Sequence, residues 1–240
     1  MFENYPKTRP ALNHEFQRIY NEHYKSNRDG ETTGASLAQK MESWLHKKVA
    51  EDAKNNTRKS TLEIGAGTLN QLKYEQSTPY DIIEPFTKLY ADSPYKKHIR
   101  RIYSDIDEIN PSEKYDRITS IATFEHILDL PKVLAKSALL LNENGVLRVA
   151  IPNEGTILWK LGWKLTTGIE FKLKYGLNYG ILMKYEHVNT ADEIEKLLFY
   201  FFKKQRCSCF GLGKKLAFYR FYECAMPDIE LAKNYLEQKI

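Results

Sequence analysis

Two patterns of apolar residues divide the chain. Between Ser36 and Ala53 the apolar residues recur at helical spacing, which predicts one amphipathic helix. From residue 62 onward, short apolar runs separated by polar turns replace that spacing. The runs are Leu62–Ile64, Tyr80–Glu84, Ile99–Tyr103, Arg117–Ala122 and Val146–Ile151. Their length and spacing predict five β-strands.

Helical patterns between these runs indicate how the strands connect. Phe86–Asp92 and Pro131–Leu141 have helical spacing, and Asp129 lies near the start of the second. Asn144-Gly145 supplies a turn into the fifth strand. Strands that alternate with helices form parallel sheets with helices on both faces. We therefore expect an α/β fold in this part of the chain.

The pattern changes after Pro152. Residues 154–186 are rich in Trp, Tyr, Lys and Gly and interrupt the alternation, so we expect an insert there. A helix is predicted at Thr190–Phe202, with Thr190 and Glu193 as its capping box. The next segment predicts a hairpin, whose strands Cys207–Leu212 and Leu216–Cys224 are joined by Gly211–Lys214. A final helix is predicted to begin at Pro227, Asp228 and Glu230.

The size of the chain fits one domain. It has 240 residues, of which 42% are hydrophobic and 28% are charged. We expect a helical cap over residues 1–60, packed on a domain over residues 61–240 that contains the insert at 154–186. The start, MFENYPKTRP, has no apolar signal-peptide core, and no apolar run approaches the roughly 18–20 residues that span a bilayer. The sequence therefore predicts a cytoplasmic protein.

The cysteine content and the net charge restrict the possible functions only weakly. Cys207, Cys209 and Cys224 are few and odd in number, which fits a reducing compartment. Cys207 and Cys209 would face one way on a strand, but no second ligand pair follows. We therefore expect buried thiols and predict no metal site. The net charge of +5 mildly favours an anionic partner without specifying one.

A glycine turn follows the first predicted strand in the segment TLEIGAGTLNQL. Gly65 and Gly67 fit the first two glycines of a dinucleotide fingerprint, but Asn70 stands at the third position. No Gly-Lys-Ser/Thr follows, as a P-loop would require. The turn therefore brings the backbone close to a ligand but is poorly suited to a pyrophosphate.

Acidic residues mark the ends of three consecutive predicted strands. Glu84 comes about 20 residues after the glycine turn, where a carboxylate can accept hydrogen bonds from both ribose hydroxyls. Asp105, after the third strand, can accept from an adenine amine, and Glu63 ends the first. Three carboxylates suit a nucleoside that carries a cation and would repel a diphosphate. The alternative is that acidic loops are common after surface strands.

In combination, these motifs resemble class I S-adenosylmethionine-dependent methyltransferases. LEIGAG resembles the first motif of that family, IIEP the second, SDID the third and YDRITSIATFEHI the fourth, so the resemblance covers residues 61–152. FEHILDL followed by a leucine-rich helix is similar to the subgroup that methylates quinone intermediates and small molecules. The resemblance implies a Rossmann-like, seven-stranded, mostly parallel sheet with an antiparallel last strand, helices on both faces, an N-terminal helical segment and a lid-like insert.

The resemblance also implies roles in binding S-adenosylmethionine. Gly65 and Gly67 would pass under its methionine part, and Glu63 would reach its amino group through water. Glu84 would hold the ribose. The other implied residues are Asp105 and Ile106, which would frame the adenine, and Thr123 and Phe124, which would line the pocket floor. The short interval before the second strand implies a short first helix, which would bring Gln71, Lys73 and Tyr74 nearer the pocket.

Two histidines are candidate catalytic bases, because transfer to oxygen requires removal of a proton. His126 follows the fourth strand, and His187 precedes a predicted helix. Glu125 and Glu186 are placed to orient them. The alternative for each ring is packing against the cofactor or capping a turn. We expect the other histidines at the surface: His14, His23, His46 and His98. We expect Tyr20 and Tyr24 either to close over the site or to pack against the rest of the protein.

Missing motifs exclude several acceptors. The fourth motif lacks Asn/Asp-Pro-Pro-Tyr and Pro-Cys, which argues against base or glutamine N-methylation and against cytosine C5 chemistry. No acid cluster suits a magnesium-bound catechol. There is no recognisable RNA-binding appendage and no broad basic face, so we expect no nucleic-acid partner.

The insert suggests a substrate class. Trp159 and Trp163 lie one helical turn apart among several lysines. Three interpretations stay open: a lid over a phosphate-bearing small molecule, a contact with an anionic membrane surface, or core and homodimer contact. Aromatic, basic inserts resemble those of enzymes of surface-polysaccharide pathways, which favours a hydroxyl or amine of a nucleotide- or lipid-linked sugar. The alternatives are a quinone-like or other small metabolite, or a catalytically silent partner protein.

Overall fold

A seven-stranded sheet forms the centre of the molecule, with strand order β3-β2-β1-β4-β5-β7-β6. The structure is a computed structural model that describes residues 2–20 and 36–238. Pairing is parallel from β3 to β5, whereas β7 is antiparallel to both of its neighbours. The strands are β1 (Thr61–Ile64), β2 (Tyr80–Ile83), β3 (Ile99–Tyr103), β4 (Tyr115–Ile121), β5 (Leu141–Pro152), β6 (Phe202–Leu212) and β7 (Leu216–Pro227). The predicted sheet with its antiparallel strand is thus confirmed.

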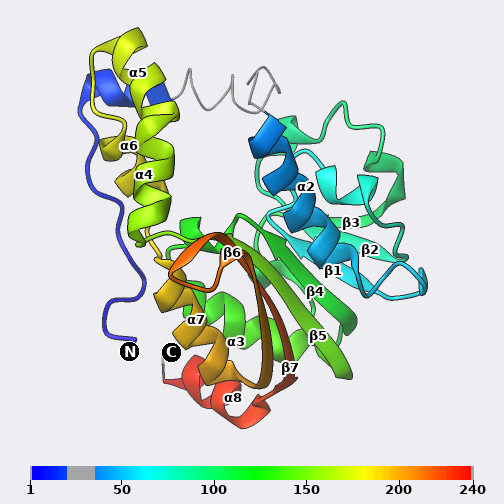
Figure 1. Cartoon of the computed structure of the whole chain (residues 1–240). Coiled ribbons are helices and arrows are strands. Elements are labelled where there is room, and N and C mark those ends of the chain that lie inside the picture. Colours follow the sequence, from blue (N-terminus) through cyan, green and yellow to red (C-terminus); the bar gives the residue numbers. More distant parts are fainter. Residues whose placement is uncertain (1, 21–35, 239–240) are drawn as a thin grey trace.

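Helices cover the β4–β7 half of the sheet on both faces (Figure 1). On one face α3 (Leu130–Leu140), α7 (Ala191–Phe201) and α8 (Ile229–Glu237) pack together, and their apolar residues form the main core with β1, β4 and β5. On the other face α2 (Ser36–Ala50) packs against β5 and β7 through Leu45 and Val49. The predicted capping box is present, because Thr190 accepts from the Glu193 N–H and the Glu193 side chain accepts from the Thr190 N–H.

The connections after β1, β2 and β3 contain short 3-10 turns in place of full helices. They are Asn70–Lys73, Thr87–Leu89, Lys96–His98 and Ile106–Glu108. The prediction of a helix at Phe86–Asp92 is therefore wrong. Phe86 is 54% exposed and only Tyr90 of this segment is buried, so a helix here would have no continuous apolar face to bury. The prediction of a short first helix is confirmed.

Two local expectations about the later strands need correction. Asn144-Gly145 does not precede β5 but lies inside it, where the pairing with β4 is irregular. Of the cysteines, Cys224 is buried, but Cys207 is exposed and Cys209 is partly exposed. Both lie on β6, which is the edge strand of the sheet and has mostly exposed or partly exposed residues.

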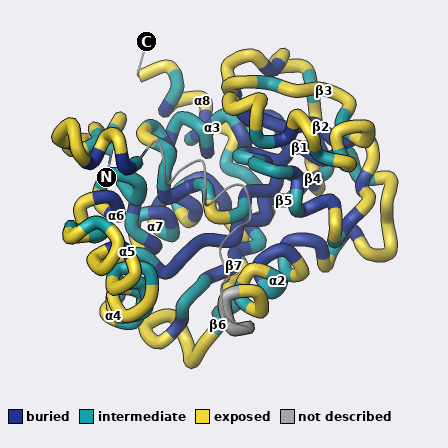
Figure 2. The backbone as a smooth tube through the Cα atoms, turned by 90° about the horizontal axis from the view of Figure 1, so that it is seen from above, coloured by how far each residue is buried: buried dark blue, intermediate teal, exposed yellow. Residues whose placement is uncertain are grey.

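The insert forms a helical lobe beside the sheet. It contains α4 (Ile157–Leu165), α5 (Thr167–Tyr175) and α6 (Gly180–Glu186). Residues 14–20 are also helical and pack on it, since Phe16 and Ile19 share a core with Phe171 and Leu182. Figure 1 shows this N-terminal segment running alongside α5 and α6, and Figure 2 shows that the outer surfaces of α4 and α5 are largely exposed. Tyr24 and His23 lie outside the described residues.

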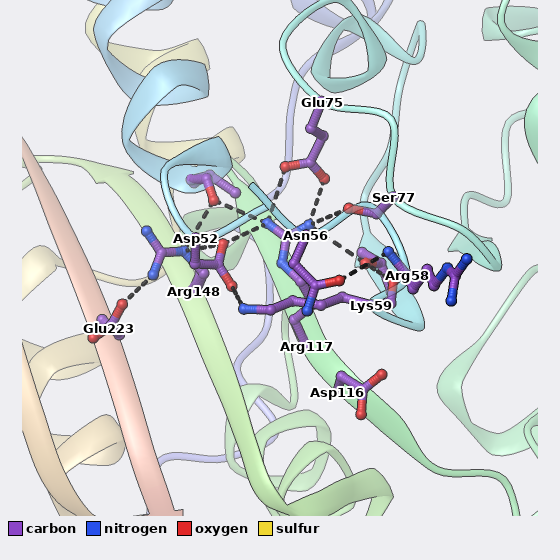
Figure 3. A network of polar contacts seen from close by, with 12 residues as sticks. Asp52, Asn56, Arg58, Lys59, Glu75, Ser77, Asp116, Arg117, Arg148 and Glu223 are labelled. Carbon is purple, nitrogen blue, oxygen red and sulfur yellow. Dashed lines mark hydrogen bonds and ion pairs between the residues drawn. The ribbon is translucent and has the colours of Figure 1, made fainter. Parts of the chain in front are cut away.

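A buried ion network fixes the end of α2 against the sheet (Figure 3). The fully buried Arg117 of β4 donates to both carboxylate oxygens of Glu75, at 2.7 and 2.9 Å, and to the Val49 carbonyl at 2.9 Å. Arg148 of β5 donates to the carbonyls of Val49 and Lys48. Cations at the last carbonyls of a helix complement its dipole, so this network places α2 on the sheet.

No helix among residues 2–20 and 36–238 is long and apolar enough to cross a bilayer.

Candidate functional site

A cavity of about 1150 Å³ opens at the carboxyl ends of β1, β2 and β4. In parallel sheets this edge is where ligands bind, at the point where the strand order reverses. Here β1 lies between β2 and β4: the chain passes from β1 to β2 and β3 on one side and then crosses to β4 on the other side. One end of the cavity is lined by the glycine turn and carboxylates, and the other by residues of β4, the insert and the N-terminal segment.

The two glycines of the turn serve different needs. Gly65 has φ of +74°, and a Cβ built there would come within 2.3 Å of Thr123 Oγ1. Gly67 has φ of +52°, but a Cβ there would meet no protein atom within 4 Å. Gly65 is therefore required for packing of β1 against the loop after β4. Gly67 leaves open space on its cavity side, as a bound ligand close to the backbone would require.

The three predicted carboxylates all line the cavity. Glu84 is held by the backbone: its Oε2 accepts from the Gly67 N–H at 2.8 Å and its Oε1 from the Phe86 N–H at 3.0 Å. Asp105 is exposed and accepts from the Asp107 N–H. Each carboxylate oxygen retains capacity for a further hydrogen bond, so these groups can also accept from a ligand.

Glu63 is the most deeply buried of the three. Its side chain accepts a hydrogen bond from the Tyr80 hydroxyl at 2.9 Å. Burial raises the pKa of Glu63 to about 8, and that hydrogen bond only partly offsets the effect. A cation placed beside this group would restore its ionised form.

Of the other predicted contacts, Thr123 and Ile106 border the cavity. Phe124 does not: it is completely buried in the main core. The prediction for Phe124 is therefore corrected. The 3-10 turn at Phe124–His126 directs this ring toward the sheet and leaves the next side chains for the site.

Helix α2 places His46 in the site, which the sequence did not predict. His46 was expected at the surface, but it is 8% exposed and lines the cavity. Its Nδ1 lies 2.8 Å from Gln71 Oε1, and its ring stacks on Tyr74. Burial lowers the pKa of His46. Gln71 and Tyr74 were expected near the pocket. Their partner, His46, is separated from them by more than 20 residues, so the local spacing of residues did not indicate that it lies beside them.

At the far end of the cavity, His126 and His187 lie edge to face, with ring centroids 4.9 Å apart. His126 lines the cavity. His187 lies behind it and borders a second cavity of about 490 Å³ beside the N-terminal segment. The structure thus brings the two predicted histidines together, although they lie on different elements.

Hydrogen bonds fix the tautomers of both rings. The Nδ1–H of His126 donates to the Glu186 carbonyl at 2.9 Å, because a carbonyl can only accept. The Nδ1–H of His187 donates to Glu154 Oε2 at 2.7 Å. Burial opposes ionisation of Glu154, but the bonds from His187 and the Trp159 indole outweigh it and lower its pKa. In its neutral form each ring therefore carries its lone pair on Nε2.

Glu125 lies beneath the two rings. Its side chain is 2% exposed, and its Oε2 is buried with no hydrogen-bond partner. Burial raises the pKa of Glu125 to about 7. Its backbone carbonyl accepts from the N–H groups of Val188 and Asn189, which joins the loop after β4 to the start of α7.

Comparison with known proteins agrees with this geometry. A family model described as a methyltransferase domain matches residues 35–198. The ubiquinone biosynthesis O-methyltransferase of Rhodopseudomonas palustris (strain BisB5) is 30% identical over 113 residues, which are 46% of this chain and 42% of the relative. The counterpart of Bradyrhizobium diazoefficiens matches with the same identity and coverage. The chain thus spans less than half the length of these curated relatives.

Solved structures share the fold at low identity. The plantazolicin methyltransferase BpumL, in complex with a pentazolic desmethylPZN analogue and S-adenosylhomocysteine (SAH), has a TM-score of 0.60 at 16% identity over 88% of this chain and 93% of that one. A possible histamine N-methyltransferase from Thermotoga maritima has a TM-score of 0.55 at 15% identity over 88% and 98%. Since the family model covers more than half of the chain, this protein belongs to the methyltransferase-domain family.

Proposed function

We propose that this methyltransferase acts on a hydroxyl oxygen of a small aromatic molecule of the quinone-precursor type. The observation that carries the proposal is the division of one cavity into two ends. The β1 and β2 end offers glycine backbone and carboxylates, and the β4 and insert end offers the imidazole of His126 among tyrosines, with His187 directly behind it. The first end fits a cationic nucleoside, and the second fits an acceptor with a removable proton.

For the cofactor, the roles expected from sequence fit the geometry of the first end. Glu84, held rigid by the Gly67 and Phe86 N–H groups, would accept from the ribose hydroxyls. Glu63 would face the amino group of the methionine part. Gly67 leaves open space along the backbone, and Asp105 and Ile106 border the cavity where the adenine would lie.

For the acceptor, the lining of the second end favours a flat, partly apolar molecule. Tyr20, Tyr185 and Tyr219 border the cavity there with Ile121. Aromatic and apolar walls with a few polar groups are typical of small-molecule sites. The names of the two relatives, both ubiquinone biosynthesis O-methyltransferases, support the same class. The nucleotide- or lipid-linked sugar expected from the insert has no such support and stays a prediction, as do the membrane and homodimer contacts.

The side chains divide the chemistry between positioning and proton removal. When bound, S-adenosylmethionine supplies an electrophilic methyl group on a positively charged sulfur. His126 Nε2 would accept the hydroxyl proton while the acceptor oxygen bonds to the methyl carbon, and the carbon–sulfur bond electrons stay on sulfur. Positioning of the reacting atoms supplies about 7–11 kcal/mol in favourable cases, and a positioned base adds about 10²–10⁴-fold.

The test is methyl transfer from isotopically labelled S-adenosylmethionine to a matched panel of acceptors, read by mass spectrometry. The panel contains dihydroxy-aromatic acids with and without a prenyl chain, nucleotide sugars and polysaccharide extracts. We expect the label on an aromatic hydroxyl oxygen. Label only on sugars would replace the aromatic class with the sugar class. Binding of SAH by calorimetry, without turnover of any acceptor, would favour the catalytically silent alternative.

A further inference from the structure

Three side chains with metal-ligating atoms converge behind the acceptor end of the cavity, which His126 lines. Glu125, His126 and His187 each place one such atom within 4.8 Å of the other two. Glu125 and His126 come from the 3-10 turn after β4, and His187 comes from the residue after α6. About 60 residues, which include α3, β5 and the insert, separate His187 from the other two, so the fold, not local sequence, brings them together.

The hydrogen bonds around the two rings leave both Nε2 atoms ready to bind a cation. A histidine that ligates a metal almost always donates its other N–H to a carbonyl or carboxylate, which fixes the tautomer. His126 donates to the Glu186 carbonyl, and His187 donates to Glu154. A third residue supports this layer, since the Trp159 indole donates to the same Glu154 oxygen at 2.7 Å.

The third ligand is independently marked by an unsatisfied atom. Glu125 Oε2 is buried without a hydrogen-bond partner, and the other oxygen of this carboxyl group, Oε1, lies 3.7 Å from His126 Nε2. A buried carboxylate oxygen with no partner costs free energy, roughly 1–3 kcal/mol or more for a charged group. A cation shared with the two imidazoles would satisfy it.

We propose that Glu125, His126 and His187 form a binding site for a divalent first-row transition-metal ion. Two imidazole nitrogens and one carboxylate oxygen suit zinc, cobalt, iron or manganese, whereas magnesium prefers oxygen ligands alone. Ligands about 2.0–2.2 Å from one ion lie about 3.5 Å apart in a tetrahedral site. Glu125 Oε1 and His126 Nε2 already lie 3.7 Å apart, and all three ligand atoms lie within 4.8 Å of one another, so small side-chain movements would complete the site.

The site deepens the proposed function and rests on it for its role in catalysis. Three protein ligands leave at least one position on the ion open, on the cavity side of His126. An acceptor hydroxyl bound there would lose its proton to solvent more easily, because a bound divalent ion lowers the pKa of an attached oxygen. With the ion bound, both Nε2 atoms are ligands, and the ion replaces the free imidazole as the group that activates the oxygen.

The test is cobalt binding to untagged, chelator-treated protein, followed by visible ligand-field absorption and by metal analysis after gel filtration. We expect one ion per chain. Glu125→Gln, His126→Ala and His187→Ala should each weaken binding by at least tenfold, and Glu154→Gln by about 10–100-fold, the usual effect of losing the partner of a ligating histidine. Magnesium at the same concentration should not displace cobalt. His98→Ala, at an exposed histidine outside the site, should bind as the wild type does.

Each variant is first checked for SAH binding by calorimetry, which reports an intact fold at the other end of the cavity. Absence of cobalt binding to the wild type overturns the proposal, and so does equal binding by the wild type and the folded Glu125→Gln variant. The proposed function fails separately: cobalt binding without methyl transfer to any aromatic acceptor contradicts only the acceptor class. Full activity of metal-free protein, with no bound ion, contradicts only the metal site.

Discussion

At the scale of single residues, Gly65 and Gly67 show why two similar positions in a motif are not equivalent. Both have positive φ, which favours glycine. Only Gly65 also faces a protein atom, Thr123, at a distance that no Cβ tolerates. Because a Cβ at Gly67 would meet no protein atom, a substitution there tests for a bound ligand and not for packing within the protein.

We predict that Gly67→Ala weakens SAH binding far more than it weakens the fold. A non-glycine residue in the left-handed region costs about 1–2 kcal/mol, and the added methyl group would occupy the space next to the cofactor. Gly176→Ala is the matched control, because Gly176 has φ of +70°, also meets nothing within 4 Å and caps α5 away from the cavity. Calorimetry and urea unfolding should show similar stability losses but lost binding only for Gly67→Ala. Equal SAH affinity in the two variants would contradict the placement of the cofactor.

At the scale of elements, α2 connects the buried ion network to the site. Its last turn is fixed by Arg117 and Arg148, while Leu45 and His46 line the cavity. Gln71 joins the two regions: its amide donates to Glu75 and to the His46 carbonyl. Loss of the network should therefore affect both stability and cofactor binding.

We predict that Glu75→Ala destabilises the protein by about 3 kcal/mol or more, because the buried Arg117 loses both hydrogen bonds to Glu75 and keeps only Asp52, which it shares with Arg148, as a carboxylate partner. Urea unfolding measures the loss. SAH affinity should also fall, since α2 loses its anchor. Glu230→Ala is the control: this residue is exposed and pairs only loosely with Lys233, so it should cost less than about 1 kcal/mol. If the double variant Glu75→Leu, Arg117→Met is no more stable than Glu75→Ala, an uncompensated charge is not the cause.

These elements also show what the sequence could and could not predict. The five apolar runs identified all of the parallel strands, because strand burial is a local pattern. The glycine turn and the carboxylates at the ends of β1, β2 and β3 were placed correctly at one edge, because parallel strands share that edge. The helix predicted at Phe86–Asp92 was wrong because only Tyr90 of this segment is buried, which leaves no continuous apolar face for a helix. His46 and Phe124 were misplaced because their surroundings come from distant segments. Arg117 gave no signal of its role, since Glu75 lies 42 residues away.

At the scale of the whole molecule, burial of Glu63 links the stability of the fold, the binding of the cofactor and the protonation of this carboxyl group. Its pKa is about 8 in the folded protein, raised by burial from an ordinary value near 4.5. Between these values the folded state holds a proton that the unfolded state has released, so this group's contribution to stability falls as pH rises and is constant above pH 8. A ligand whose cationic amino group faces Glu63 favours the ionised form of this carboxyl group and must displace that proton.

We therefore predict that SAH binds more tightly, and stabilises the whole fold more, as pH rises from 6 to 8, by up to about tenfold in affinity per pH unit. Calorimetry in two buffers of different ionisation enthalpy should detect release of close to one proton at pH 6.5, and thermal unfolding should show a larger stabilisation by SAH at pH 8.5 than at pH 6.5. In Glu63→Gln, which keeps the size of the side chain and cannot ionise, proton release should disappear and affinity should no longer depend on pH in this range. If the wild type and Glu63→Gln release the same number of protons, Glu63 does not face the cation, because ionisation of this carboxyl is the only step that distinguishes the two proteins.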